Sequence, residues 1–234
     1  MTKSSLGWRA IGLGLMAVIL CSAAMAAEQE TWDGLVPVEA KKVQKAYLLP
    51  GADFHGYTKV VIDPPLVEFR KNWQRDFNRS TSSLSGRLST SDIEAIRTAL
   101  AEGFQQILSA GFAKAGWEVG AAEGPDVLRL TPVLLNVYIN APDTRSAGRS
   151  TTYAVEAGEA TLALEIRDSE TGQLMGRVVD RRVAGRSGSI PMMRNRVTNR
   201  ADFERLLKTW TGILVDGLAG LKAASPVAPA RPEQ

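Results

Sequence analysis

The sequence has one histidine and one cysteine among 234 residues, and only 6% of its residues are aromatic. With a single histidine, His55, the chain cannot build a zinc site from several histidines and cysteines, and a Ser-His-Asp arrangement would have to use this one residue. The motifs Gly-x-Ser-x-Gly, Ser-x-x-Lys and His-Glu-x-x-His are absent from the sequence, as is a glycine-rich phosphate loop. We therefore interpret His55 as a surface or turn residue and expect no metal site, no cofactor and no catalytic residue of these types.

Long hydrophobic runs are also scarce. The uncharged apolar stretch 11–20 is about half as long as a helix that spans a bilayer. Lys3 and Arg9 precede it, and Ala24-Met25-Ala26 follows with small residues at the positions that a signal peptidase recognises. We interpret residues 1–26 as a signal peptide that is removed after export, which predicts a periplasmic protein.

Cys21 leaves two alternatives open. The lipid-accepting cysteine of a bacterial lipoprotein follows the apolar part of the signal and is normally preceded by a small residue, whereas Leu20 precedes Cys21 here. Cleavage after Ala26 is the favoured interpretation; the alternatives are lipidation at Cys21, which would give an outer-membrane lipoprotein, and an uncleaved anchor. Only these alternatives attach the chain to a membrane. After cleavage at Ala26 the chain has no cysteine, so its stability must come from an apolar core rather than from disulfides.

The exported part has no excess charge of either sign, because residues 27–234 hold 26 basic and 25 acidic residues. The sequence pI of about 9.1 therefore does not indicate a polyanionic partner, and export argues against nucleic acid as a ligand. A composition of 44% hydrophobic and 23% charged residues is that of a globular protein. We predict a lead-in segment over residues 27–56, a single domain over 57–222 and a disordered tail over 223–234, whose prolines favour flexibility.

Four segments have the β-branched or alternating pattern of strands. They cover residues 57–69, 127–139, 160–167 and 174–183. Pro64-Pro65 interrupts the first strand, and the turn Asp-Ser-Glu-Thr-Gly at 168–172 joins the last two into a β-hairpin. The polar stretches 70–89 and 184–198 are predicted to be loops.

Two segments have the spacing of amphipathic helices. The first begins at a capping-box pattern, Ser91–Glu94, and ends at Gly116, and the second has Asn199 as its N-cap and ends near residue 222. The order strand, helix, strand suggests a parallel crossover, to which the hairpin adds antiparallel strands. We therefore predict an α/β fold, a two-layer sandwich in which two helices cover one face of a mixed sheet of about four strands.

Two basic stretches are candidate partner-binding surfaces. In residues 70–79 cations alternate with aromatic residues, so Trp73 and Arg75 are candidates for binding anionic lipid head groups or envelope glycans; alternatively, Trp73 and Phe77 pack onto the core. The stretch 186–200 combines arginines with an adaptable methionine pair, which suits docking of an envelope protein, and its alternative is a solvated loop. Its candidate residues are Arg186, Met192, Met193, Arg194, Arg196 and Arg200.

Carboxylates offer the remaining route to catalysis. Those of the hairpin region are Glu159, Glu165, Asp168 and Asp180. Two of them could act as the acid and base of a glycosidase, but the same strands carry basic residues, so we expect solvated carboxylates or cross-strand ion pairs instead. The basic residues are Arg167, Arg177, Arg181 and Arg182. The favoured hypothesis is non-catalytic binding of a protein or an anionic envelope component, with a carboxylate-dependent envelope glycan hydrolase as the alternative; the oligomeric state is not indicated.

Two parts of the sequence resemble a known family. The strand Tyr57–Pro64, which ends in Asp-Pro, and the hairpin Gly158–Leu174, which is followed by Asp180-Arg181-Arg182, resemble bacterial envelope proteins of domain of unknown function 3313. The resemblance covers roughly residues 47–221. It implies a location in the Gram-negative envelope, where lipoproteins occur among the members, and it implies no established activity. The sequence around Cys21 departs from the lipoprotein pattern.

Overall fold

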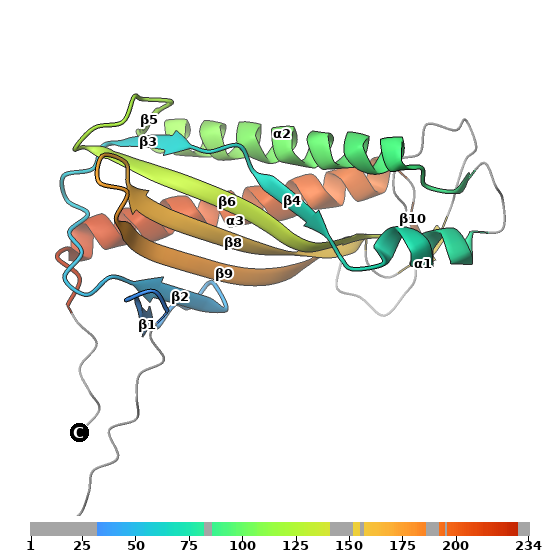
Figure 1. Cartoon of the computed structure of the whole chain (residues 1–234), viewed down its shortest axis with the longest axis horizontal. Coiled ribbons are helices and arrows are strands. Elements are labelled where there is room, and N and C mark those ends of the chain that lie inside the picture. Colours follow the sequence, from blue (N-terminus) through green and yellow to red (C-terminus); the bar gives the residue numbers. More distant parts are fainter. Residues whose placement is uncertain are drawn as a thin grey trace, which may run out of the picture.

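A computed structural model describes residues 32–81, 86–140, 152–154, 157–185, 192–194 and 196–228. Within these ranges the chain forms three helices, a mixed sheet of eight strands and a separate sheet of two strands (Figure 1). The strand order of the large sheet is β1-β2-β9-β8-β6-β3-β5, and β4 also pairs with β6. The predicted α/β class is confirmed, whereas about four strands and two helices understate the observed architecture.

Three long strands form the centre of the sheet. They are β6 (Val127–Ile139), β8 (Gly158–Asp168) and β9 (Leu174–Ala184), and β8 is antiparallel to both of its neighbours. Along β8 the side chains at 162, 164 and 166 are buried, and those at 161, 163 and 165 are half-buried, as a two-residue period requires. The predicted hairpin of β8 and β9 is confirmed.

The parallel part of the sheet adjoins β6. Both β3 (Lys59–Ile62) and β4 (Leu66–Phe69) run parallel to β6, and β5 (Glu118–Val119) runs parallel to β3. Pro64-Pro65 separates β3 from β4, as the sequence predicted. The predicted parallel crossover is confirmed, because the helix between β3 and β6 connects strands that point the same way.

The segment predicted as a lead-in contributes two strands to the opposite edge. β1 (Val36–Val38) pairs with β2 (Lys45–Leu48), and β2 is antiparallel to β9. The end of the described chain meets the same region, where the Val227 amide donates to the Ala52 carbonyl at 2.9 Å and the Gly51 amide donates to the Val227 carbonyl at 3.2 Å. Both ends of the described chain are therefore bound to the domain by backbone hydrogen bonds.

One of the three helices was not predicted, and the two predicted helices begin at other residues than expected. α1 (Trp73–Ser80) lies where a polar loop was predicted, because Trp73 is buried and Phe77, one turn later, packs against the core. α2 (Thr90–Lys114) has Ser89 rather than Ser91 at its N-cap, since Ser89 and Asp92 each bind the other's backbone amide. α3 (Arg196–Ala224) begins before Asn199, which lies within the helix and is not its N-cap.

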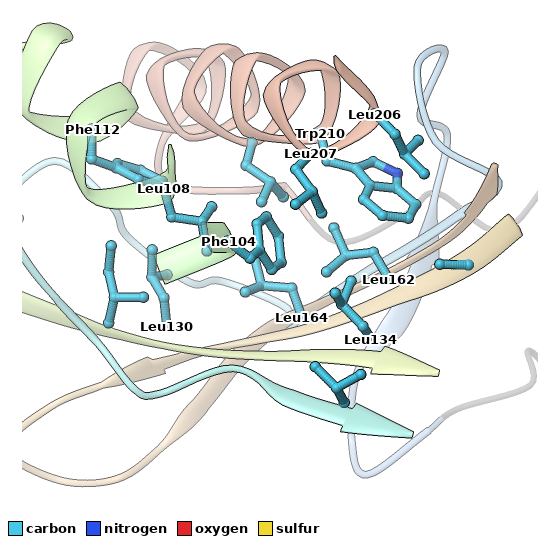
Figure 2. Packing of buried hydrophobic residues seen from close by; sticks show 14 of the residues in the cluster. Phe104, Leu108, Phe112, Leu130, Leu134, Leu162, Leu164, Leu206, Leu207 and Trp210 are labelled. Atoms are coloured by element: carbon cyan, nitrogen blue, oxygen red, sulfur yellow. The ribbon is translucent and has the colours of Figure 1, made fainter. Parts of the chain in front are cut away.

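The core lies between the sheet and the two long helices. Both α2 and α3 cover the same face of the sheet, and Phe104, Leu164 and Trp210, each 0% exposed, meet between the layers (Figure 2). The helices pack closely, because a Cβ atom at Gly111 of α2 would lie 2.2 Å from Cγ2 of Thr211 of α3. This arrangement confirms the two-layer sandwich with helices on one face.

Residues 1–26, including Cys21, lie outside the described residues, so the export interpretation stays a prediction. Among the described helices, none combines the length and the apolar character that crossing a membrane requires.

Candidate functional site

A largely apolar cavity of about 560 Å³ lies between α3, the sheet and the segment that joins β1 to β2. The sheet side is lined by Ala46, Tyr47, Leu48, Leu164, Ile166, Arg177 and Val178. The helix side is lined by Ile213, Leu214, Gly217, Leu218, Gly220 and Leu221. Residues 38–43 form the remaining wall. The cavity therefore lies beside the main core, where α3 faces the edge of the sheet formed by β1 and β2.

Two glycines of α3 give the cavity room. Gly217 and Gly220 line it, and a Cβ atom added at either position would meet no atom within 4 Å. Because helical residues three and four apart share a face, Ile213, Gly217 and Gly220 form one stripe along the cavity. A large side chain at either glycine would enter open space rather than collide with the domain.

An ion pair connects two walls of the cavity. Nζ of Lys42, in the segment between β1 and β2, lies 2.9 Å from Oδ2 of Asp216 on α3, and both side chains are 64% exposed. An exposed pair of this kind contributes about 0–1 kcal/mol to stability. Lys41 also lines the cavity and makes no ion pair in the part of the chain that the structure describes. The walls are thus joined at the rim by a contact that opens easily.

The first predicted basic surface forms a pocket of about 560 Å³ at the end of β4. It brings Arg70, Trp73 and Arg75 together with Arg97 of α2. Trp73 is only 3% exposed, however; its ring stacks on Phe69 at 4.6 Å. The alternative that Trp73 packs onto the core is therefore confirmed.

The arginines of this pocket already have anionic neighbours. Arg70 forms an ion pair with Glu159, and the nitrogens Nε of Arg75 and Arg97 each lie 3.2 Å from a carboxylate oxygen of Asp76 and Glu94, respectively. Because each of these arginines is paired with a carboxylate, the pocket has little excess positive charge to attract an anionic ligand. Binding of head groups or glycans by Arg75 stays a prediction.

The second predicted surface is only partly described. Arg186 lies outside the described residues, whereas Met192, Met193 and Arg194 form β10, which is antiparallel to β7 (Thr152–Ala154). Arg196 and Arg200 belong to α3, and Arg200 is exposed with Nε 3.1 Å from Oε1 of Glu204. Part of the predicted loop is thus a strand that pairs with residues 152–154. The role of the stretch 186–200 in partner docking stays a prediction.

The carboxylates of the hairpin are held in ion pairs and hydrogen bonds. Glu165 accepts hydrogen bonds from Arg177 at 2.6 Å across the strands and from Arg167 at 2.7 Å along its own strand. Burial of Glu165 opposes its charge, but these hydrogen bonds outweigh burial and hold the pKa of Glu165 below its usual value. These partners therefore favour the ionised form of Glu165, whereas a glycosidase acid has a raised pKa.

Two other carboxylates of this set are similarly engaged. Glu159 pairs with Arg70 and with Arg181 across the strands, and Asp180 accepts a hydrogen bond from Arg182 at 2.6 Å. The expected cross-strand ion pairs are thus confirmed for Glu159 and Glu165. None of the four hairpin carboxylates lines the apolar cavity.

Asp168 ties the hairpin turn to the segment that precedes β3. Its carboxylate accepts hydrogen bonds from the Tyr57 hydroxyl at 2.7 Å and from the Thr171 amide at 2.7 Å. Burial raises the pKa of Asp168, but these bonds more than offset burial and leave its pKa lowered, while burial and the adjacent carboxylate raise the pKa of Tyr57. Asp168 therefore has a structural role in its ionised form.

This arrangement predicts an acid-sensitive contribution to stability. The folded-state pKa of Asp168 lies below the unfolded value of about 3.9, so its contribution is complete above that pH and is lost as the pH falls through the lower folded-state value. Asp168→Asn should lower the free energy of unfolding at pH 7 and reduce its decline between pH 4 and pH 2, measured by urea denaturation. Glu170→Gln, an exposed change in the same turn, is the control. An unchanged pH dependence in Asp168→Asn would contradict the assignment.

His55 is exposed, as the sequence predicted. Its Nδ1 lies 3.0 Å from Oδ1 of Asp53, and both side chains are more than half exposed. The contact joins residues two apart in one turn and is a local surface interaction. Across the described ranges, no three residues of the His, Cys, Asp and Glu types come together in a way that could hold a metal ion.

The sequence did not predict the cavity, because its lining comes from segments far apart in the chain. One signal was available, namely the spacing of Gly217 and Gly220 on an otherwise amphipathic helix, since glycine is unfavourable within a helix and needs a structural reason.

The comparison with protein families identifies the group to which the chain belongs. The model of the family DUF3313, described as a protein of unknown function, matches residues 27–213. The chain belongs to the DUF3313 family. This confirms the resemblance seen in the strand that ends in Asp-Pro and in the β8–β9 hairpin. For this DUF3313 protein, no curated protein gives a match.

Solved structures resemble this DUF3313 protein only distantly. The PelC dodecamer from Paraburkholderia phytofirmans shares 9% identity with it, with a TM-score of 0.35, over 72% of this chain and 95% of PelC. A protein from Xanthomonas campestris assigned to DUF330 shares 14% identity, with a TM-score of 0.37, over 76% of this chain and 91% of its own. Neither similarity bears on what this chain binds.

Proposed function

We propose that the chain is a non-catalytic binding domain of the bacterial envelope and that it binds an apolar ligand in the cavity between α3 and β2. The observation that carries this proposal is the cavity itself. Its volume of about 560 Å³ falls in the range of small-molecule sites, about 300–1,000 Å³. Such sites are mostly apolar with a few polar groups at chosen points, and here the charged side chains of Lys42 and Asp216 meet at the rim.

Two observations favour binding over catalysis. The hairpin carboxylates do not line the cavity, and the arginine partners of Glu165 favour its charged form, which suits an ion-pair network better than an acid catalyst. The pattern of a signal peptide in residues 1–26 supports export, and it therefore supports an envelope component as the ligand. We propose a periplasmic location on the same ground.

Filling the cavity from α3 tests the proposal. The purified protein should bind the apolar fluorophore 1-N-phenylnaphthylamine with saturation, and Gly217→Leu should weaken this binding by about tenfold or more, because the leucine occupies the space that the probe needs. Gly220→Leu should have the same effect. Titration of the fluorescence increase measures the affinity.

Gly212→Leu is the matched control. Gly212 lies on the same helix, and a Cβ atom there also meets open space, but Gly212 does not line the cavity. All three changes replace glycine with a better helix former, so the variants should remain folded. Equal affinity of wild type and both cavity variants would contradict the proposed site.

A further inference from the structure

We infer that the ligand of the apolar cavity is a medium-chain fatty acid, with its acyl chain along α3 and its carboxylate at Lys42 and Lys41. This inference rests on the proposed function and adds the chemical class of the ligand. It combines three features of the cavity: its length along the helix, the two neighbouring lysines in its wall, and the ion pair that joins its walls.

The cavity follows the helix axis. Its lining on α3 runs from Ile213 to Leu221, which corresponds to about 12 Å at 1.5 Å per residue. Along this length the helix presents Gly217 and Gly220 and aliphatic side chains, while the sheet opposite presents Leu164, Val178 and other aliphatic groups. An elongated, flexible apolar chain matches these walls. The volume suits one ligand of drug size and hence one acyl chain rather than the two of a phospholipid.

The wall formed by residues 38–43 has two lysines, Lys41 and Lys42, and one carboxylate, Glu39, and Asp216 of α3 faces Lys42. When a ligand displaces Asp216 from Lys42, the two lysines exceed the one carboxylate of this wall. The guanidinium of Arg182, itself paired with Asp180, donates a hydrogen bond to the Lys42 carbonyl at 2.7 Å. The local charge therefore favours an anionic head group over a neutral or cationic one.

Asp216 occupies the position that a ligand carboxylate would take. Its contact with Nζ of Lys42 is exposed, so it contributes little and exchanges readily with another carboxylate. A fatty acid that enters the cavity would replace Asp216 at Lys42 and keep that lysine paired, with Lys41, which makes no ion pair to a described residue, next to it in the chain. Asp216 thus acts as an internal competitor for the head group, and its removal should strengthen binding of the acid.

Displacement of 1-N-phenylnaphthylamine by dodecanoate and by 1-dodecanol tests the inference, because the two ligands share an acyl chain and differ in charge. Dodecanoate should bind about tenfold more tightly than the alcohol. Decanoate should bind about tenfold more weakly than dodecanoate, since each buried methylene contributes about 0.8 kcal/mol. Asp216→Asn should raise the affinity for dodecanoate several-fold and change that for the alcohol less.

Lys42→Met should remove most of the preference for dodecanoate, whereas Lys208→Met, an exposed change on α3 outside the cavity lining, should preserve it. Equal affinities for acid and alcohol in wild type, together with no effect of Lys42→Met or Asp216→Asn, would overturn the fatty-acid inference and leave the apolar site in place. If Gly217→Leu and Gly220→Leu leave the binding of the probe, the acid and the alcohol unchanged, the proposed function itself would be overturned.

Discussion

Replacement of Trp210 by alanine should lower the free energy of unfolding by about 3–5 kcal/mol. Trp210 is 0% exposed, and its indole lies between α3 and the sheet beside Leu207 and Leu162 (Figure 2). The change removes the largest fully buried side chain of the core and leaves a cavity that its neighbours cannot fill. It also removes the hydrogen bond that Nε1 of Trp210 donates to Oδ2 of Asp180 at 2.8 Å.

Trp210→Phe separates these two effects. Phenylalanine retains most of the apolar volume but has no hydrogen-bond donor, so this variant should lose about 1–3 kcal/mol, the cost of removing a partner from a buried charged group. Asp180 is 3% exposed and keeps the hydrogen bonds from Arg182 and from the Gln44 amide. Urea denaturation followed by far-UV circular dichroism gives both values. A loss below about 1 kcal/mol for Trp210→Ala would contradict the central place of this residue in the core.

The long elements could be predicted from the sequence because their burial is periodic. β6 extends from Val127 to Ile139, the same bounds that its alternating pattern predicted. Ile93, Phe104 and Leu108 lie on the buried face of α2 as their spacing predicted. In a long helix or strand the same hydrophobic period repeats several times, so many residues support the same secondary-structure prediction.

The short elements could not be predicted in this way. β1 and β2 contain three and four residues, too few to establish a period; β2 is ordered by pairing with β9, and β1 by pairing with β2. α1 depends on Trp73 and Phe77 contacting the core, which is a tertiary effect that the polar sequence around them conceals. The first residue of α2 was predicted wrongly for another reason. Ser89 and Ser91 both fit a capping pattern, and only the packed structure selects between them.

The ion pairs of the hairpin were predictable, whereas the cavity was not. The turn at residues 168–172 fixes the register of β8 and β9, and this register places Glu165 opposite Arg177. The cavity instead requires the β1–β2 edge and α3 to meet, although Leu48 and Ile213, the lining residues of these elements that are nearest in the chain, are 165 positions apart. Local sequence patterns contain no information about a tertiary contact between such distant segments.

Arg177→Ala should lower the free energy of unfolding by about 3 kcal/mol, near the lower end of the cost of breaking a buried ion pair. Arg177 is 7% exposed, and its Nη2 lies 2.6 Å from Oε1 of Glu165 and 2.9 Å from Oδ2 of Asp33. Burial opposes the charge of Arg177, but the two carboxylates more than compensate and raise its pKa. Glu165 is 30% exposed and keeps Arg167, which limits the loss.

The same guanidinium also holds the beginning of the described chain. Its Cζ lies 4.0 Å from the centre of the Trp32 ring, so Arg177→Ala should also release Trp32 and change its fluorescence. Asp33→Asn is the control, because this carboxylate is 60% exposed and its pair with Arg177 should contribute less than about 1 kcal/mol. The double variant Glu165→Leu/Arg177→Leu should be less destabilised than the sum of the two single variants, since no unpaired buried charge remains. Equal losses in Arg177→Ala and Asp33→Asn would show that the Arg177–Glu165 pair does not stabilise this edge of the sheet.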